Sequence, residues 1–212
     1  MEILDPTALA AFIHDYPAWV AAILFLIVFM EAIIGVGYLV PAATVLFSVG
    51  ALISAGAVSP IAAVLGASVG ATIGGSASYW LGRQGADRIH GMWPFRTRPA
   101  LLERNQRFVE RHGGKSILLS RFTKALRPTV PAVAGMLGME PLRFAIYNVV
   151  GAFAWACIYL GVGVALGATL DFSPAQAIQI SALLLTLTLF FGIAVALQRR
   201  RRQAVAGEDS ST

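Results

Sequence analysis

Four ionisable side chains occur in stretches of the sequence that are otherwise apolar: Glu31, Arg121, Lys124 and Arg127. No Lys, Arg, Asp or Glu occurs at positions 16–30 or 32–82, so Glu31 is isolated. An ionisable group at membrane depth is costly and marks a functional candidate. We predict that Glu31 carries a proton or, if a cation lies close, is its counter-ion. A fixed structural ion pair or a glutamate at the membrane interface is the alternative.

Arg121 and Arg127 are six residues apart, with Lys124 midway between them. A guanidinium group presents a planar fork of donors that suits phosphate oxygens. We therefore predict that the two arginines, assisted by Lys124, bind a substrate phosphate. Pro128 and Pro131 disfavour a regular helix here, so the direction of each side chain stays open. The alternative is that these side chains extend to the aqueous interface.

The composition excludes a soluble enzyme and a disordered chain. Hydrophobic residues make up 57% of the 212 residues and charged residues 13%, whereas soluble domains carry about 25% charge. Residues 83–115 hold eight basic and three acidic residues, which accounts for the whole net charge of +5. A basic loop beside an apolar run is typical of the cytoplasmic side of a membrane rather than of nucleic-acid binding. One cysteine and three scattered histidines predict no metal site, and no motif predicts a cofactor or an enzyme.

The apolar runs predict an all-α integral membrane protein, because a spanning helix needs about 20 apolar residues. A turn at Gly56, Ser59 and Pro60 divides the longest uncharged run. The predicted membrane domain covers 18–198, between an N-terminal segment at 1–17 and a basic tail at 199–212. Its expected spans are 19–34, 61–82, 144–170 and 175–198.

Two further apolar stretches, 35–56 and 116–139, are interrupted by glycine and proline. Broken backbone at membrane depth persists only where protein or water satisfies its polar groups. We therefore predict two re-entrant hairpins that enter from opposite faces, as in inverted-repeat transporters. The residues expected to shape them are Pro41, Gly50, Pro128, Pro131 and Gly135.

Two helical patterns complete the prediction. Residues 99–112 place apolar side chains on one face, which predicts a cytoplasmic interfacial helix; a solvated helix packed on the second hairpin is the alternative. The 61–82 span has a small residue at every fourth position, which favours close packing against another helix. That stripe consists of Ala62, Gly66, Gly70, Gly74, Ser78 and Gly82. The basic loop and Arg199–Arg202 predict that both termini are cytoplasmic.

These residues together identify a family resemblance, which covers roughly residues 15–170. The chain resembles the DedA family, also described as the VTT or SNARE-associated Golgi protein domain. The matching motifs are Phe29-Met30-Glu31 with Pro41, Gly70-x-x-x-Gly74 before Tyr79-Trp80-Leu81-Gly82-Arg83, Arg121-Phe122, Arg127, and Ala134-Gly135.

The resemblance implies opposed re-entrant hairpins and lipid transport. Bacterial members are implicated in recycling undecaprenyl phosphate across the inner membrane, and eukaryotic relatives scramble phospholipids. It also implies dependence on the proton-motive force. Glu31 matches the acid of the family's first hairpin, and Arg121 and Arg127 match its two essential arginines.

Three positions depart from the family pattern. Ala43 and Gly75 replace acids that many members carry, and Lys124 replaces a proline between the two arginines. Proton coupling is therefore expected to differ from that of other members, whereas phosphate binding by the arginines is less affected.

The expected function is a flippase of the bacterial inner membrane that translocates undecaprenyl phosphate or another phospholipid. A proton-coupled carrier of a small solute or cation, with Glu31 as coupling group, is one alternative. A membrane assembly factor that transports nothing is another. Membrane lipid and protons are the expected partners, and the sequence does not decide whether the chain forms a homo-oligomer.

Overall fold

The computed structural model describes residues 15–33, 42–85, 91, 95–97, 99–124 and 126–170, with isolated positions 176, 179, 183 and 186. The described residues form seven α-helices and one 3₁₀ helix and contain no strand, which confirms the all-α prediction. In chain order these elements are α2 (Pro17–Ala32), α3 (Ala42–Ser54), α4 (Pro60–Arg83), η1 (Phe95–Thr97), α6 (Pro99–His112), α7 (Lys115–Ser120), α8 (Thr129–Met136) and α9 (Pro141–Leu170).

Local sequence signals account for where these helices begin and end. Pro60 occupies the first turn of α4, where no backbone donor is needed, and the Ser59 hydroxyl accepts a hydrogen bond from the Ala62 N–H. The preceding turn contains Gly56 in the left-handed region (φ 75°), which glycine adopts without steric cost. Gly113, with a φ of 54°, follows the last residue of α6.

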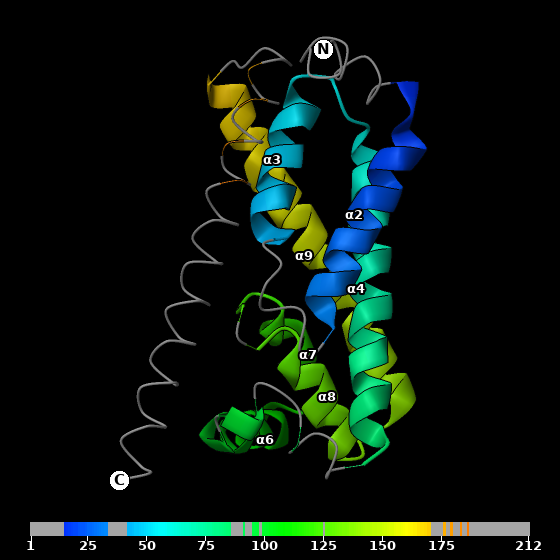
Figure 1. The fold of residues 1–212 in the computed structure, drawn as a ribbon, viewed down its shortest axis with the longest axis vertical. Helices are drawn as coiled ribbons and strands as arrows, with labels where there is room; N and C mark the ends of the chain where they lie inside the picture. The colour runs from blue at the N-terminus through cyan, green and yellow to red at the C-terminus, as the bar shows by residue number, and fades with distance from the viewer. Residues whose placement is uncertain are drawn as a thin grey trace, which may run out of the picture.

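Helix α4 is the element against which most of the others pack. Its first part lies along α2, its second part along α8, and it also contacts α9. Helix α3 lies along α9 at the opposite side of the molecule (Figure 1). Helix α6 lies across one end of this bundle, close to α7 and α8 (Figure 1).

The small-residue stripe predicted for α4 is a packing surface, as expected. A Cβ atom at Gly66 would lie 2.8 Å from the Ala21 Cα, and one at Gly70 would lie 3.0 Å from the Phe25 Cα. Two turns further on, the Ser78 hydroxyl donates a 3.0 Å hydrogen bond to the Ala32 carbonyl. The missing side chains therefore let α2 and α4 approach at backbone distance.

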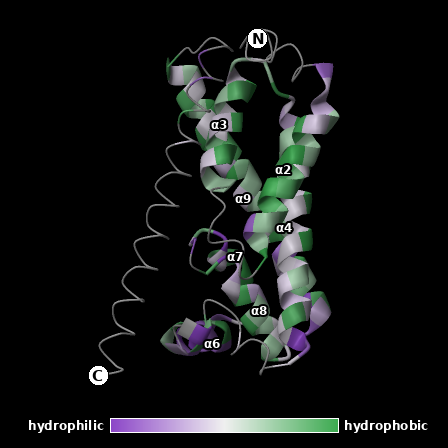
Figure 2. Ribbon diagram, viewed as in Figure 1, coloured by the Kyte–Doolittle hydropathy of each residue, from purple (hydrophilic) through white to green (hydrophobic). Residues whose placement is uncertain are grey.

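Two helices in the described part of the chain, α4 and α9, are long and apolar enough to cross a membrane, and α2 and α3 are shorter apolar helices. Large apolar side chains are exposed at helical spacing along the outside of this bundle. Apolar residues predominate along α2, which is largely green in Figure 2. Such a surface is unfavourable in water and suits lipid. On α4 the exposed large apolar side chains are Ile61, Leu65, Val69, Ile73 and Trp80.

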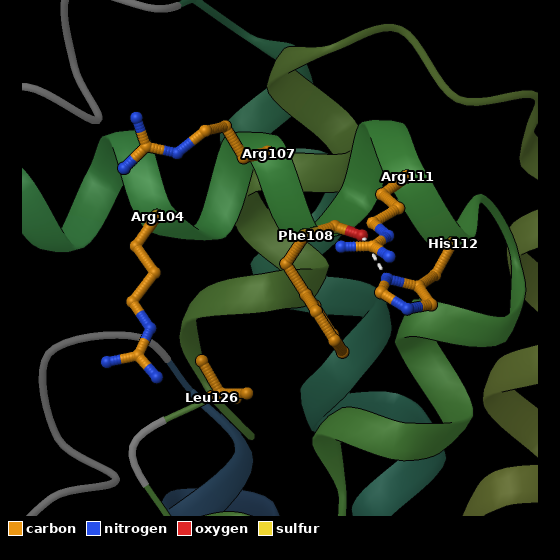
Figure 3. Close-up of a pocket in the computed structure, with 6 residues that line it drawn as sticks. All are labelled: Arg104, Arg107, Phe108, Arg111, His112 and Leu126. Atoms are coloured by element: carbon orange, nitrogen blue, oxygen red, sulfur yellow. Dashed lines mark hydrogen bonds between the residues drawn. The ribbon is translucent and has the colours of Figure 1, made fainter.

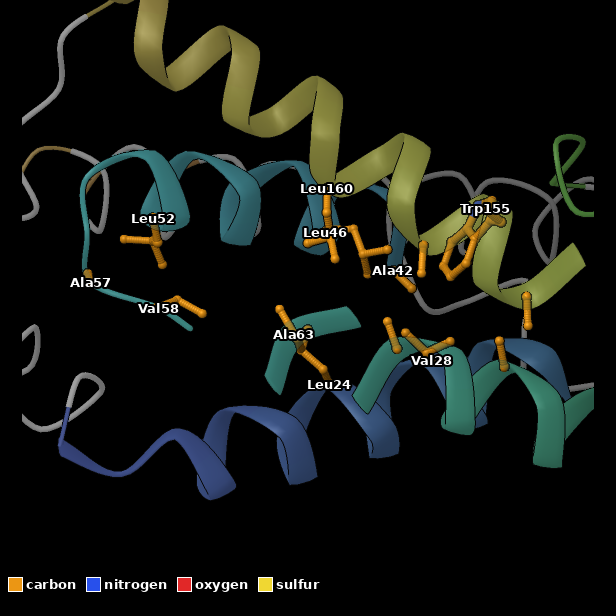
Figure 4. Close-up of a cluster of buried hydrophobic side chains, with 14 residues drawn as sticks. Leu24, Val28, Ala42, Leu46, Leu52, Ala57, Val58, Ala63, Trp155 and Leu160 are labelled. Atoms are coloured by element: carbon orange, nitrogen blue, oxygen red, sulfur yellow. The ribbon is translucent and has the colours of Figure 1, made fainter. Parts of the chain in front are cut away.

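Two buried clusters form the core. The first joins α2, α3, α4 and α9 around Leu24, Leu46 and Trp155 (Figure 4). The second joins the end of α4 to α6, α7, α8 and the start of α9, where the Tyr79 and Phe144 rings stack at 4.2 Å. The boundary between these clusters is where the charged side chains meet.

The two stretches predicted as hairpins differ in their backbone. Within 116–139 the chain forms two short helices, α7 and α8, of six and eight residues, and the re-entrant path predicted for this stretch stays a prediction. Within 35–56 it forms a continuous α3, with Gly50 in the helix interior rather than at a turn. A Cβ at Gly50 would lie 2.7 Å from the Gly163 Cα, so this glycine serves close packing of α3 on α9. Four parts of the prediction lie outside the described residues: positions 1–14 of the N-terminal segment, Pro41, the tail at 199–212, and all but isolated positions of the span at 175–198.

Substitution of Gly70 by isoleucine tests the α2–α4 contact. We expect a loss of about 1–3 kcal/mol in the free energy of unfolding, because the new side chain meets the Phe25 backbone. Thermal unfolding in a fixed detergent measures the effect. Gly161→Ile is the matched control, since a Cβ there meets no atom within 4 Å. Equal melting temperatures for the two variants would contradict this packing.

Candidate functional site

The structure brings Glu31 and Arg127 together as a buried ion pair. Glu31 is in the last turn of α2, and Arg127 is in the turn between α7 and α8. The Arg127 Nη1 lies 2.5 Å from the Glu31 Oε2. Glu31 and Arg127 are 2% and 5% exposed. A carboxylate and a guanidinium that are 96 residues apart in the chain therefore neutralise each other inside the bundle.

The remaining donors of Arg127 hold the backbone of its own turn. Its Nε and Nη2 donate hydrogen bonds of 3.0 Å and 2.8 Å to the Arg121 carbonyl. Its guanidinium also lies 4.4 Å from the centre of the Trp155 ring on α9, a favourable cation–π arrangement. Arg127 therefore connects the turn at 121–128 to α2 on one side and to α9 on the other.

Arg121 is buried without a carboxylate partner among the described residues. Its side chain is 3% exposed, and its Nη2 donates to the Ala71 carbonyl at 3.1 Å and to the Asn148 Oδ1. Both acceptors are neutral. The Nε of Arg121 is buried and has no hydrogen-bond partner, which is unusual for a buried donor.

A second buried donor without an acceptor lies on α9, one turn after a residue of that helix that faces Arg121. The Trp155 Nε1 is buried and has no partner. Gly151, one turn earlier, faces Arg121: a Cβ there would lie 3.5 Å from the Arg121 Nε. Together with Glu31 and Arg127, these groups form the central cluster: Glu31, Arg121, Arg127, Asn148 and Trp155. Its side chains carry one excess positive charge and two N–H donors that lack acceptors.

Lys124 does not join this cluster. Its side chain is exposed, and within the described residues it makes no ion pair, although its charge acts on Glu31 at longer range. Pro128 caps the start of α8, and Pro131 lies in the first turn of that helix, where a missing N–H is tolerated. Gly135 is inside α8, where a Cβ would lie 3.0 Å from the Arg83 backbone nitrogen on α4.

Asn148 and Trp155 are site residues that the sequence analysis missed. Asn148 is nevertheless the only amide side chain in the uncharged run at 144–170, and a polar side chain in a span commonly bonds to another helix. Its Nδ2 donates to the Thr72 carbonyl at 2.9 Å, which ties α9 to α4. Nothing in the sequence marked Trp155 as a site residue, because an aromatic residue in an apolar run most often packs in the core. No group of His, Cys, Asp or Glu that could hold a metal ion occurs in the described part of the chain.

Comparison with known proteins agrees with these features. The VTT domain model matches residues 16–165, which include the whole central cluster. Protein DedA of Escherichia coli is 35% identical over 158 residues, covering 73% of this chain and 72% of that protein. The chain belongs to the DedA family. Two other relatives from E. coli are the inner membrane protein YabI (32% identity, covering 79% of this chain and 66% of that protein) and the inner membrane protein YqjA (28%, covering 93% and 94%). No solved structure matches the chain.

Membership of the DedA family places this chain in a membrane. The relatives YabI and YqjA are named inner membrane proteins. Members of the family are regarded as transporter-like or lipid-related and are not known as enzymes.

The structure shows why Gly75, where many DedA proteins carry an acid, has no side chain here. A Cβ at position 75 would lie 2.7 Å from the Asn148 Oδ1 and 3.2 Å from the Arg121 Nη2. The Asn148 amide oxygen therefore occupies the space beside Arg121. A neutral acceptor from α9 stands next to the guanidinium, so no carboxylate among the described residues pairs with Arg121.

A double-substitution cycle tests the buried ion pair. We expect Arg127→Gln or Glu31→Gln alone to cost about 3–5 kcal/mol, because each leaves a buried charge without its partner. The double variant is expected to lose much less than the sum of the two. Thermal unfolding of all four proteins in one detergent measures the coupling. Additive losses would show that the two groups do not interact.

Proposed function

We propose that this protein is a membrane lipid transporter that translocates a phosphate-bearing lipid, undecaprenyl phosphate or another phospholipid, across the inner membrane. The observation that carries the proposal is the excess positive charge of the central cluster. An uncompensated buried charge is costly unless it is paired, and the phosphate of a lipid supplies the missing negative charge. Phosphate oxygens would accept hydrogen bonds from the two unused donors, Arg121 Nε and Trp155 Nε1.

In this proposal the two arginines have different roles. Arg121 contacts the phosphate first, because its Nε is unoccupied. Arg127 has hydrogen-bond partners at all three nitrogens, two contacts holding the turn and one holding Glu31. Protonation of Glu31 weakens the ion pair and frees Arg127 Nη1 for the phosphate. Lys124, exposed on the same turn, assists as the lipid enters.

Access to the central cluster requires a movement of the protein. Glu31, Arg121 and Arg127 are all at most 5% exposed. The turn at 121–128 joins helices of only six and eight residues, each much shorter than the roughly 20 residues of a membrane span. We propose that this segment is a re-entrant hairpin, that 35–56 is its counterpart from the opposite leaflet, and that they open alternately. The basic loop and both termini are then cytoplasmic.

A proton-coupled carrier of a small solute or cation is the second candidate, because Glu31, paired with Arg127, could serve as its coupling group. Proteoliposomes separate the two. A substrate-dependent pH change without added polyprenyl lipid favours the solute carrier. Movement of the lipid phosphate between leaflets favours the lipid transporter.

The main test is lipid translocation by Arg121→Gln. The readout is the rate at which undecaprenyl phosphate becomes accessible on the far side of proteoliposomes. We expect this rate to fall by a factor of about ten or more, since a hydrogen bond to a charged group is worth about 1.5–3 kcal/mol. Arg143→Gln is the control: this arginine is exposed and outside the central cluster. Equal rates for Arg121→Gln and the wild type would remove the role given to Arg121.

Trp155→Phe tests the indole N–H. Phenylalanine keeps an aromatic ring beside Arg127 and removes the donor together with the five-membered part of the indole. We expect about tenfold weaker binding of the lipid phosphate, because a donor to a charged acceptor is lost, and a lower melting temperature, because the smaller ring leaves a cavity at this buried position. Equilibrium binding in detergent measures this. Unchanged affinity would show that Trp155 Nε1 is not a phosphate ligand.

A further inference from the structure

A second basic cluster lies outside the central cluster, on α6. Figure 3 shows the Arg104 side chain extending from α6 alongside Leu126, with the Phe108 ring beside it. Leu126 comes from the turn between α7 and α8, so two elements contribute to the pocket. We call it the α6 pocket. It has a volume of about 380 Å³ and is lined by Arg104, Arg107, Phe108, Arg111, His112 and Leu126.

The arginines of the α6 pocket make no ion pair within 4 Å among the described residues. Arg104, Arg107 and Arg111 recur at three- and four-residue spacing and therefore share one side of the helix. All three are exposed. The acids of α6, Glu103 and Glu110, do not line the pocket. The only ion pair among the described residues is the buried one of the central cluster. Three arginines thus line the pocket, and the planar fork of a guanidinium group favours phosphate.

The floor of the α6 pocket is apolar. Phe108 and Leu126 are half-buried, and the Phe108 ring lies 4.7 Å from the His112 ring. The His112 Nδ1 is 3.0 Å from the Phe108 carbonyl, which can only accept, so this nitrogen donates. A charged rim above an apolar floor suits an amphiphile better than a free inorganic ion.

The position of the α6 pocket favours a membrane lipid as this amphiphile. α6 lies across the end of the bundle where α4 ends and α9 begins (Figure 1), and it is coloured as polar beside the apolar helices in Figure 2. This is where lipid phosphates lie around an apolar bundle, and basic helices bind anionic lipid there. Leu126 directly precedes Arg127, so the pocket adjoins the turn of the central cluster.

We infer that the α6 pocket is a docking site for the phosphate headgroup of an anionic membrane lipid. Arg104, Arg107 and Arg111 contact the phosphate, and Phe108 and Leu126 contact the first carbons of the chain. The site requires no transport, so it stands apart from the proposed function. If transport occurs, the lipid reaches the turn at 121–128 from this pocket.

Native mass spectrometry of the full chain in detergent tests this inference with three probes. Phosphatidic acid carries a phosphate monoester with acyl chains, glycerol 3-phosphate carries the same group without chains, and phosphatidylcholine carries a zwitterionic headgroup. The test variant is Arg104→Gln/Arg107→Gln/Arg111→Gln. The control is Arg96→Gln/Lys115→Gln/Arg143→Gln, which removes the same number of exposed charges outside the pocket. Arg121→Gln separates binding at the central cluster.

We expect phosphatidic acid to bind the wild type and the control variant at least about tenfold more tightly than the test variant, because each basic residue changes affinity for an anionic lipid several-fold. Phosphatidylcholine should not distinguish the variants, and Arg121→Gln should retain this binding. Equal affinity of the test and control variants for phosphatidic acid would overturn the inference. Binding of glycerol 3-phosphate as tight as that of phosphatidic acid would show a site for soluble phosphate and would overturn the lipid assignment. Loss of transport in Arg121→Gln with intact docking would leave this inference standing.

Discussion

Two guanidinium groups and one carboxylate are enclosed together in an apolar helix bundle, and much of the structure serves to make that burial tolerable. Glu31 cancels the charge of Arg127 across 96 residues of chain. Arg127 in turn uses its other donors on the Arg121 carbonyl. The ion pair thus holds the end of α2, the turn at 121–128 and, through Trp155, the middle of α9. Since a buried pair adds little stability by itself, its retention points to a role beyond stability.

Close backbone approach is what allows a chain of this size to enclose these charges. Glycines on α4 admit the backbones of α2 and α8, and Gly50 and Gly163 admit each other between α3 and α9. The apolar exterior then faces lipid, and the polar groups are directed to the boundary between the two core clusters. The same packing leaves Arg121 with neutral partners only among the described residues. Asn148 fills the space that the absent side chain of Gly75 leaves beside Arg121.

The two basic clusters differ in the physics of their charges. In the central cluster, low exposure makes the single excess charge strong and its accommodation costly. In the α6 pocket the three arginines are solvated, so they attract an anion over a distance at small cost. Leu126 lines the α6 pocket and directly precedes Arg127 of the central cluster, so the two clusters adjoin in the chain.

The sequence by itself determined the membrane class, the helix limits near Pro60, Pro99 and Gly113, and the charged residues that need partners, because these depend on composition and on local turn chemistry. It also indicated the stripe on α4, since a four-residue repeat is local. Only the tertiary structure decided that Glu31 pairs with Arg127 rather than Arg121, that Gly50 packs on α9, and that Asn148 and Trp155 complete the cluster. Such pairings depend on which helix faces meet and on the direction of each side chain, and residues far apart in the chain carry no local signal of either.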